Sequence, residues 1–404
     1  MNVAVAGAGK MGAEIFRLLA RSSLDVTLYA RNASRAAELE KKHLKDVRRS
    51  VRRGTLSKEE AESRRCCVHV TGRLEDLAGA DIVIEAISED FDSKSALFKE
   101  LEPLLREDTV IGTNSSSLSV EELALELSHP ERFCGMHFFY PVSLIRMVEI
   151  ISWRGASESS LDLVTEFCRA VSRKPIRVID GPGSIVNSVL AYYYTEALYI
   201  LEEGHALPSQ IDSLARRFCT LGPCESADAV GIDLFVKGLQ NVTAMGGLFQ
   251  LQSSEESGRV LTREECAGRG GFYIPHLFAV LLEANRLGRK TSAGLYIYED
   301  DHPVDDDACF YRDPGQTAVE KQGDDLLADR LLYAIFNGVL YGLHAAAASR
   351  KDLDDSTKEV LLMERGPFEL MDGLGEERVR QDFNRLSDTV GERFRHESDW
   401  VSWR

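Results

Sequence analysis

Two ionisable residues lie inside apolar segments where a strand would normally bury hydrocarbon. His137 lies within the apolar segment FCGMHFFYP, and Glu149 lies within RMVEII, twelve residues further along the chain. An ionisable group is tolerated in such surroundings when it is paired, and it often marks a chemical site. Either residue alone would be interpreted as a satisfied polar group of the core. Together they predict a general base, because a carboxylate can hold a histidine ring in one tautomer.

The segment that must position this pair begins at the first residue. MNVAVAGAGKMG predicts a short buried strand that runs into Gly7, Gly9 and Gly12 in GxGxxG spacing, and the helical pattern AEIFRLLARS follows. Glycines are required there because the turn is tight, the backbone approaches a pyrophosphate, and the helix packs closely on the strand. The pyrophosphate then lies at the helix N-terminus. This context predicts a dinucleotide-binding site.

The next strand, in LDVTLYARN, bears on which dinucleotide is bound. An NAD site usually ends this strand with an acid that binds the adenosine ribose hydroxyls, but here Ala30 is followed by Arg31. Loss of the carboxylate removes repulsion toward a 2′-phosphate, and a guanidinium offers that phosphate a bidentate partner. The sequence therefore modestly favours NADP(H) over NAD(H). The alternative is a solvated loop whose arginines contact nothing.

Composition limits the class of protein. The chain has 404 residues, 44% of them hydrophobic and 28% charged, which predicts a soluble globular protein of two or three domains. A net charge of −17 argues against nucleic acid or an anionic membrane as the main partner. No uncharged apolar stretch has membrane-spanning length, and the chain begins on a core strand, so we expect a cytoplasmic protein. The eight cysteines form no CxxC pair, so we expect neither a metal site nor a disulfide framework.

One segment is strongly basic against this acidic background. Residues 41–65 carry cations at helical spacing, namely Lys45, Arg48, Arg49, Arg52 and Arg53. The run GTLSKEE then predicts a turn and a helix N-cap. We expect a charged helical hairpin, at about residues 36–66, inserted in the nucleotide domain. It is either a solvated surface or a clamp for a phosphorylated carrier such as coenzyme A.

Polar residues also follow two further predicted strands. ADIVIEAISED predicts a buried strand ending near Glu85 and Glu89, with Lys94 on the following helix. DTVIGTNSSSLSV predicts another strand that breaks into the serines 115–117. Ligands of such sheets bind at the strand ends. Because Ser119 can cap the next helix, the three earlier serines are expected to be free for a ligand.

With these motifs in place, residues 1 to about 300 resemble the L-3-hydroxyacyl-CoA dehydrogenase family. The matching strings are GAGKMG, VIEAISED, TNSSSL, GMHFFYPV with RMVEI, GPGSIVN and RLGRKTSAGLY, in family order and spacing. The resemblance implies that His137 is the general base and Glu149 its orienting carboxylate. It also implies that Ser116 and Asn187 are polar contacts at the reacting centre. The reaction implied is interconversion of an L-3-hydroxyacyl-CoA and a 3-oxoacyl-CoA by hydride transfer with NAD(P).

The resemblance extends to the ligands. It implies that Glu89, Lys94, Ser116 and Lys290 approach the dinucleotide, and that the basic hairpin is the coenzyme A clamp. Arg53 and Lys94 are then the expected anchors of that carrier.

The sequence departs from the family pattern at three places. Tyr140 replaces the asparagine of HFFNP, which in relatives lies near the nicotinamide. Ala30 and Arg31 replace the ribose-binding acid, and Asp46 falls where a small polar residue of the clamp is expected. These departures bear on cofactor and substrate rather than on the proton-transfer pair.

The remainder of the chain predicts helices that occur twice. EALYILEEGHALPSQID, residues 196–212, aligns with GVLYGLHAAAASRKDLD, residues 338–354, at a constant offset of 142. Asp329 stands where Asn187 stands in the first copy, so we expect the second copy to be structural. The predicted architecture is an α/β Rossmann-type dinucleotide-binding domain, an all-α domain, an acidic linker and a repeated all-α domain, at residues 1–184, 185–300, 301–324 and 325–404. Residues 245–271 are either a lid or disordered.

Other functions remain open on the same scaffold. The substrate could be a carrier-protein thioester or a free hydroxy acid instead of an acyl-CoA. A catalytically silent, crystallin-like dinucleotide-binding protein is the alternative from another class, and a regulator that senses the dinucleotide has only the shared fold in its favour. Because stacked helical copies bury surface within one chain, either a monomer or a homodimer is compatible with the sequence.

Overall fold

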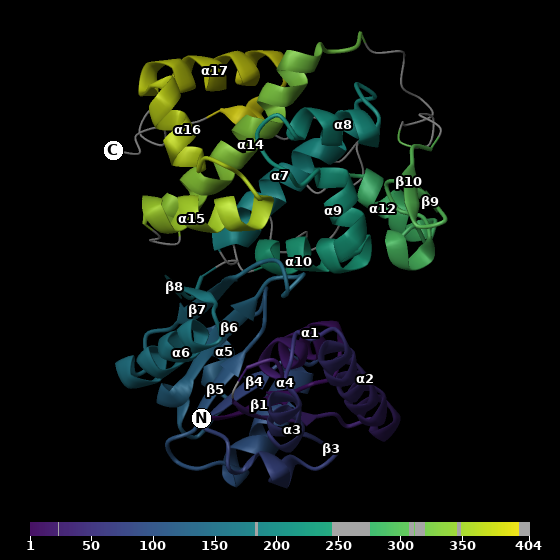
Figure 1. The fold of residues 1–404 in the computed structure, drawn as a ribbon. Coiled ribbons are helices and arrows are strands. Elements are labelled where there is room, and N and C mark those ends of the chain that lie inside the picture. Colours follow the sequence, from purple (N-terminus) through teal and green to yellow (C-terminus); the bar gives the residue numbers. More distant parts are fainter. Residues whose placement is uncertain are drawn as a thin grey trace. The chain divides into compact units, whose positions relative to one another are not determined.

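The computed structural model describes two compact units, Met1–Asp180 and Gly181–Arg404 (Figure 1). The described residues are 1–22, 24–181, 185–244, 275–306, 311, 320–345 and 349–395. Residues 245–271, interpreted above as a lid or a disordered segment, lie outside them, as does part of the predicted linker.

An eight-stranded sheet forms the centre of the N-terminal unit, with strand order β3-β2-β1-β4-β5-β6-β7-β8. The strands are β1 Asn2–Ala6, β2 Asp25–Tyr29, β3 Val68–Thr71, β4 Ile82–Glu85, β5 Val110–Thr113, β6 Phe133–Phe138, β7 Met147–Ser152 and β8 Lys174–Ile179. All neighbours are parallel except β6 and β7, which are antiparallel. The carboxyl ends of β1, β4, β5 and β6 therefore meet along one edge of the sheet.

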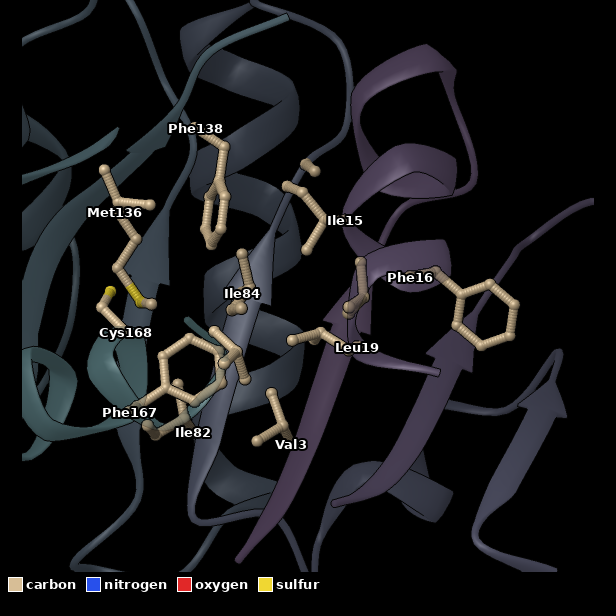
Figure 2. Packing of buried hydrophobic residues seen from close by; sticks show 14 of the residues in the cluster. Val3, Ile15, Phe16, Leu19, Ile82, Ile84, Met136, Phe138, Phe167 and Cys168 are labelled. Atoms are coloured by element: carbon tan, nitrogen blue, oxygen red, sulfur yellow. The ribbon is translucent and has the colours of Figure 1, made fainter. Parts of the chain in front are cut away.

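Helices cover this sheet, and the predicted Rossmann-type domain is confirmed. They are α1 Lys10–Leu19, α2 Ala33–Arg52, α3 Lys58–Cys66, α4 Phe91–Leu101, α5 Val120–Ala124 and α6 Glu158–Ala170. Alternation along β1 divides its side chains between two cores: Val3 and Val5 join one cluster, and Ala4 and Ala6 join another. Figure 2 shows the first cluster, in which α1 side chains pack against those of β1 and β4. The central strands β1 and β4 are almost wholly apolar because both of their faces are covered.

The basic segment forms two helices, α2 and α3. Val47, Leu56 and Ala61 pack together with Val51 in a small core of their own. Ser57 caps α3 in a capping box with Glu60, at the turn that the sequence predicted. The cations of α2 at positions 45, 48, 49, 52 and 53 are exposed.

The C-terminal unit is largely helical. Its helices are α7 Ile185–Glu202, α8 Pro208–Ala215, α9 Pro223–Val230, α10 Ile232–Ala244, α12 Leu277–Glu283, α14 Asp324–Ala345, α15 Arg350–Leu361, α16 Pro367–Leu374 and α17 Glu376–Thr389. A small antiparallel pair, β9 Ile297–Glu299 and β10 His302–Val304, accompanies them. Helices α7 and α14 pack so closely that a Cβ on Gly338 would lie 2.5 Å from Cα of Val189.

By length and composition α14 could cross a membrane, but 72% of its apolar window is buried inside the protein, as in a core helix of a soluble domain.

Four charged side chains form a cluster in this unit, which we call the α7–α14 network; two are fully buried, and the side chains of Arg393 and Glu203 are 9% and 26% exposed. Arg330 of α14 is fully buried, and its guanidinium bonds Glu196 at 2.6 Å and Glu203 at 2.7 Å. Arg393, after α17, bonds the same two glutamates at 2.7 and 3.0 Å. Two carboxylates and two guanidiniums thus compensate one another within the helical core.

Candidate active site

The fold brings His137 and Glu149 together by strand register. The antiparallel pairing of β6 and β7 places the two residues directly opposite each other. Cross-strand partners share one face of the sheet, so their side chains meet. Nδ1 of His137 lies 2.9 Å from Oε2 of Glu149, and both side chains are buried. The Phe139 ring packs against the imidazole, with 4.2 Å between ring centroids.

This contact leaves one nitrogen of His137 available. An ionised Glu149 only accepts hydrogen bonds, so Nδ1 carries a proton and the lone pair of the neutral ring is on Nε2. Among the described residues Nε2 has no hydrogen-bond partner. Asn114, which the sequence analysis missed, accepts a bond of 2.9 Å from the Phe138 N–H and ties the end of β5 to the end of β6. Its sequence signal is that it is the first polar residue after the buried strand VIGT.

The glycine-rich turn has the geometry of a phosphate cradle. Gly7 has φ of +129°, and a Cβ there would lie 2.5 Å from the Ala86 carbonyl oxygen. A Cβ on Gly12 would lie 2.0 Å from the Gly7 carbonyl oxygen, so this glycine permits the close packing of α1 on β1. Gly9, the N-cap of α1, faces open space and supplies no capping side chain. The N–H groups of the first turn of α1 are therefore accessible to a diphosphate, and the turn fits a dinucleotide.

At the end of β2, the structure places Ala30 in the core and Arg31 in solvent. Among the described residues Arg31 makes no hydrogen bond or ion pair. Asn32 caps α2, and Nε of Arg35 donates to the Ala8 carbonyl at 3.1 Å. A link between Arg35 and the glycine-rich turn was not foreseen, because it joins residues 27 positions apart.

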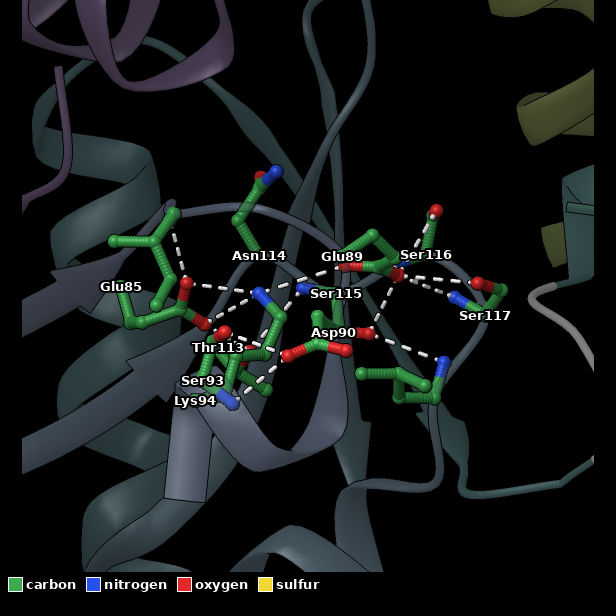
Figure 3. A network of polar contacts seen from close by, with 12 residues as sticks. Glu85, Glu89, Asp90, Ser93, Lys94, Thr113, Asn114, Ser115, Ser116 and Ser117 are labelled. Carbon is green, nitrogen blue, oxygen red and sulfur yellow. Dashed lines mark hydrogen bonds and ion pairs between the residues drawn. The ribbon is translucent and has the colours of Figure 1, made fainter. Parts of the chain in front are cut away.

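The serine turn after β5 closes around a carboxylate, shown in Figure 3. Oε1 of Glu89 accepts bonds from the hydroxyls of Ser115, Ser116 and Ser117 at 2.7, 3.3 and 3.1 Å. The N–H groups of Ser116 and Ser117 donate to the same oxygen at 2.8 and 3.0 Å. Burial would raise the pKa of Glu89, but the nearby Lys94 ammonium and these hydrogen bonds outweigh it and hold the pKa below its ordinary value.

Two predictions about this region meet contacts that were not expected. Ser119 caps α5 as expected, but the three earlier serines also bind Glu89, which was not expected; the role of Ser116 at the reacting centre stays a prediction. Lys94 was expected as a carrier anchor, yet it is only 1% exposed and its ammonium contacts both oxygens of Glu85 at 2.8 Å. A buried ammonium requires such a partner. Lys94 therefore holds the end of β4 and the start of α4 together, and its predicted contact with the dinucleotide or the carrier stays a prediction.

The remaining candidates are dispersed. Arg53 is exposed at the end of α2. Asn187 is half-buried near the start of α7, and Lys290 pairs with Asp233 at 2.5 Å. Because these two belong to the C-terminal unit, their approach to His137 and to the dinucleotide stays a prediction. Within the described part of the chain, no three His, Cys, Asp or Glu side chains are grouped so as to hold a metal ion.

Known proteins match both units. The family model described as 3-hydroxyacyl-CoA dehydrogenase, NAD binding domain, matches residues 2–181, and the model of the C-terminal domain of that family matches residues 183–298. The chain is 32% identical over 301 residues to 3-hydroxybutyryl-CoA dehydrogenase of Clostridioides difficile, covering 74% of this chain and 99% of that protein. It is 36% identical to 3-hydroxyadipyl-CoA dehydrogenase of Escherichia coli K12, covering 73% of this chain and 58% of that one.

Solved structures share the fold. (S)-3-hydroxybutyryl-CoA dehydrogenase from Ralstonia eutropha superposes with a TM-score of 0.63 at 28% identity, covering 74% of this chain and 99% of its own. 3-Hydroxybutyryl-CoA dehydrogenase from Escherichia coli K12 superposes with a TM-score of 0.79 and covers 99% of this chain and 97% of its own, at 23% identity. The similarity to the Escherichia coli structure extends over the helices beyond residue 300.

Proposed function

The chain belongs to the 3-hydroxyacyl-CoA dehydrogenase family, and from that premise we propose that it interconverts an L-3-hydroxyacyl-CoA and a 3-oxoacyl-CoA with a nicotinamide dinucleotide. The observation that carries the proposal is the buried contact of 2.9 Å between His137 and Glu149. The two residues lie at the carboxyl edge of the sheet that also ends in the glycine-rich turn.

In the oxidative direction, Nε2 of His137 takes the proton of the substrate 3-hydroxyl. In the reductive direction, the imidazolium returns that proton to the oxygen of the 3-oxo group. Glu149 holds the ring in the required tautomer and stabilises its charged form, which burial would otherwise make costly. Ser116 and Asn187 are proposed to bind the substrate oxygens and so orient the reacting carbon.

The dinucleotide, when bound, supplies the hydride acceptor or donor. Gly7, Gly9 and Gly12 shape the turn that holds its diphosphate. Glu89 is proposed to shape the nicotinamide end of the site through the serine turn that it binds.

We further propose that NADP(H) is preferred. The support is the exposed Arg31 beside a buried alanine, with no carboxylate at the end of β2 to repel a 2′-phosphate. Arg31→Ala should lower kcat/KM for NADPH by about tenfold, the order of one charge-assisted contact, with little effect on NADH. Ala30→Asp should reverse the preference. A wild-type preference for NADH that neither change moves would contradict the proposal.

The exposed cations of α2 are proposed to bind the phosphates of coenzyme A. Changing Arg48, Arg52 and Arg53 to alanine together should raise KM for a CoA thioester more than for the matching pantetheine thioester, which lacks those phosphates. Equal effects on the two substrates would mean that the hairpin is only a solvated surface. A strong preference for a carrier-protein thioester would favour the alternative substrate class.

A single experiment tests the activity itself. Purified protein is mixed with acetoacetyl-CoA and either NADH or NADPH, and the loss of absorbance of the reduced cofactor is followed. We expect turnover that saturates in both substrates. If both cofactors raise the melting temperature and no thioester is reduced, the chain is a silent dinucleotide-binding protein instead.

We also propose that residues 325–404 are a second copy of the first helical domain. The support is a repeated capping contact: Asp212 accepts bonds from two N–H groups in the first turn of α9, and Asp354 does the same for α16. Each carboxylate faces a glycine that precedes the capped helix, Gly222 or Gly366. Removing residues 301–404 should expose the α14-facing side of α7, and sedimentation should then show self-association. A truncated chain that stays folded and monomeric would contradict a packing role for this copy.

A further inference from the structure

One contact at the sheet edge belongs to neither the proton-transfer pair nor the serine turn. The ammonium of Lys10 lies over the ring of Tyr140, 3.9 Å from its centroid. Lys10 is the first residue of α1, inside the glycine-rich turn, and Tyr140 lies three residues after His137. Both side chains are solvent-exposed, Tyr140 to 37%. The contact therefore lies at the surface of the N-terminal unit.

The position of this contact follows from strand order. α1 begins after β1, and Tyr140 follows β6, with β4 and β5 between these strands in the sheet. A dinucleotide whose diphosphate lies at the N-terminus of α1 must extend toward His137 for its reacting ring to serve the base. The Lys10–Tyr140 contact connects the expected diphosphate site at the start of α1 with the segment that follows His137.

The chemistry of the pair suits a diphosphate. A helical side chain points toward the N-terminus of its helix, which for Lys10 is the phosphate-binding end. The first turn of α1 contains no acidic residue. An ammonium on a ring face still has N–H groups directed away from the ring, so it can donate to phosphate oxygens without leaving the tyrosine.

We propose that Lys10 binds the diphosphate of the dinucleotide and that the Tyr140 ring positions its ammonium for this contact. The inference deepens the proposed function and rests on it. It also gives a role to the tyrosine that replaces the family's asparagine. A flexible lysine loses side-chain entropy when it binds a ligand, and a ring that already orders the ammonium reduces that loss. Tyr140 is thus a positioning residue, and Lys10 is a contact to the cofactor.

The test measures dissociation constants of NADH and NADPH by fluorescence, at low and at moderate salt, for the intact chain and its variants. Lys10→Met should weaken both cofactors by about tenfold, as expected for one charge-assisted contact, and should flatten the salt dependence. Tyr140→Leu should weaken both by about threefold, whereas Tyr140→Phe, which keeps the ring face, should stay within about twofold of wild type. Lys58→Met is the matched control, because Lys58 is also an exposed first residue of a helix, α3.

Combining the two changes isolates the positioning role. If the ring acts only through the ammonium, Lys10→Met with Tyr140→Leu should bind no more weakly than Lys10→Met alone. Additive losses, an unchanged affinity in Lys10→Met, or tighter binding in Tyr140→Leu would each overturn the inference. A loss confined to NADPH would also overturn it, because Lys10 would then contact the 2′-phosphate. Failure of wild-type protein to bind either cofactor would instead refute the proposed function.

Discussion

Each unit of this protein buries charged side chains, but the two clusters differ in the group that each leaves without a hydrogen bond, a donor in one and an acceptor in the other. In the α7–α14 network two glutamates and two arginines face one another, and Arg330 is fully buried. In the N-terminal unit, Glu149 binds one nitrogen of His137 and leaves Nε2 without a partner among the described residues. The first cluster is balanced in charge, although Nη2 of Arg330 has no hydrogen-bond partner among the described residues, whereas the second has an unused acceptor, Nε2 of His137.

This difference separates structural from chemical use of buried charge. In a compensated cluster each charge is already paired, so the cluster does not take up a proton from a ligand. Its ion pairs connect the helices instead. A pair with one free lone pair can accept a proton from a ligand, because its second partner has been left for that ligand. Burial alone would not have distinguished the two, since Glu149 and Glu196 are both fully buried.

The largest expected effect is on chemistry at the His137–Glu149 pair. His137→Ala should lower kcat by about 10² to 10⁴, the usual contribution of general acid-base catalysis. Because alanine leaves Glu149 buried without its partner, His137→Gln is the companion variant, since its amide can still donate to the carboxylate. Both variants should bind the dinucleotide normally. Near-normal turnover in either would show that the open nitrogen is not the base.

The second effect is on stability at the compensated cluster. Arg330→Met leaves two glutamates to share the guanidinium of Arg393 and should cost about 3–5 kcal/mol in the free energy of unfolding, measured in urea. Arg385→Met is the matched control. Arg385 pairs at 2.6 Å with Asp329, which lies on α14 next to Arg330, but the Arg385 side chain is 42% exposed. An exposed pair should contribute less than about 1 kcal/mol. Similar losses in unfolding free energy for the two variants would mean that the buried ion pairs contribute no more to stability than an exposed pair.

A smaller effect is expected at Glu89, whose carboxylate is intermediate between the two cases. Glu89→Gln removes the charge that the serine turn surrounds and should cost about 1–2 kcal/mol at pH 7. The pKa of Glu89 is held below its ordinary value of 4.5, so its contribution is present above pH 4.5 and is lost as the pH falls through the lower, folded-state value. The difference in unfolding free energy between wild type and variant should therefore shrink in acid. A difference that is constant with pH would exclude a charged Glu89.

The features that could be predicted from sequence are those with local signals. Val3 and Val5 alternate with alanines on a strand buried on both faces, and the glycines of GxGxxG follow at once. Such patterns need no knowledge of distant residues. The contact between His137 and Glu149 was also accessible, because twelve residues are enough for one strand to turn back on another in register.

The contacts that were missed join separate elements. Glu89 and the serine turn are some 27 residues apart, and the polar composition of that turn equally suits a ligand. Lys94 was expected from the family resemblance to contact the dinucleotide and the carrier, but its burial beside Glu85 depends on a neighbouring strand. Lys10 and Tyr140 meet only because the sheet order brings β1 and β6 to one edge. Each depends on topology, which residue spacing does not encode.

The bond between Arg393 and Glu196 also has a consequence for biosynthesis. The two residues are 197 positions apart, so α7 leaves the ribosome long before the arginine that compensates its glutamate has been translated. Until then Glu196 can be paired only by Arg330 or solvated by water, and the helical unit cannot complete its core. We therefore expect a chain that ends before residue 393 to be cleaved by proteases faster than the full chain.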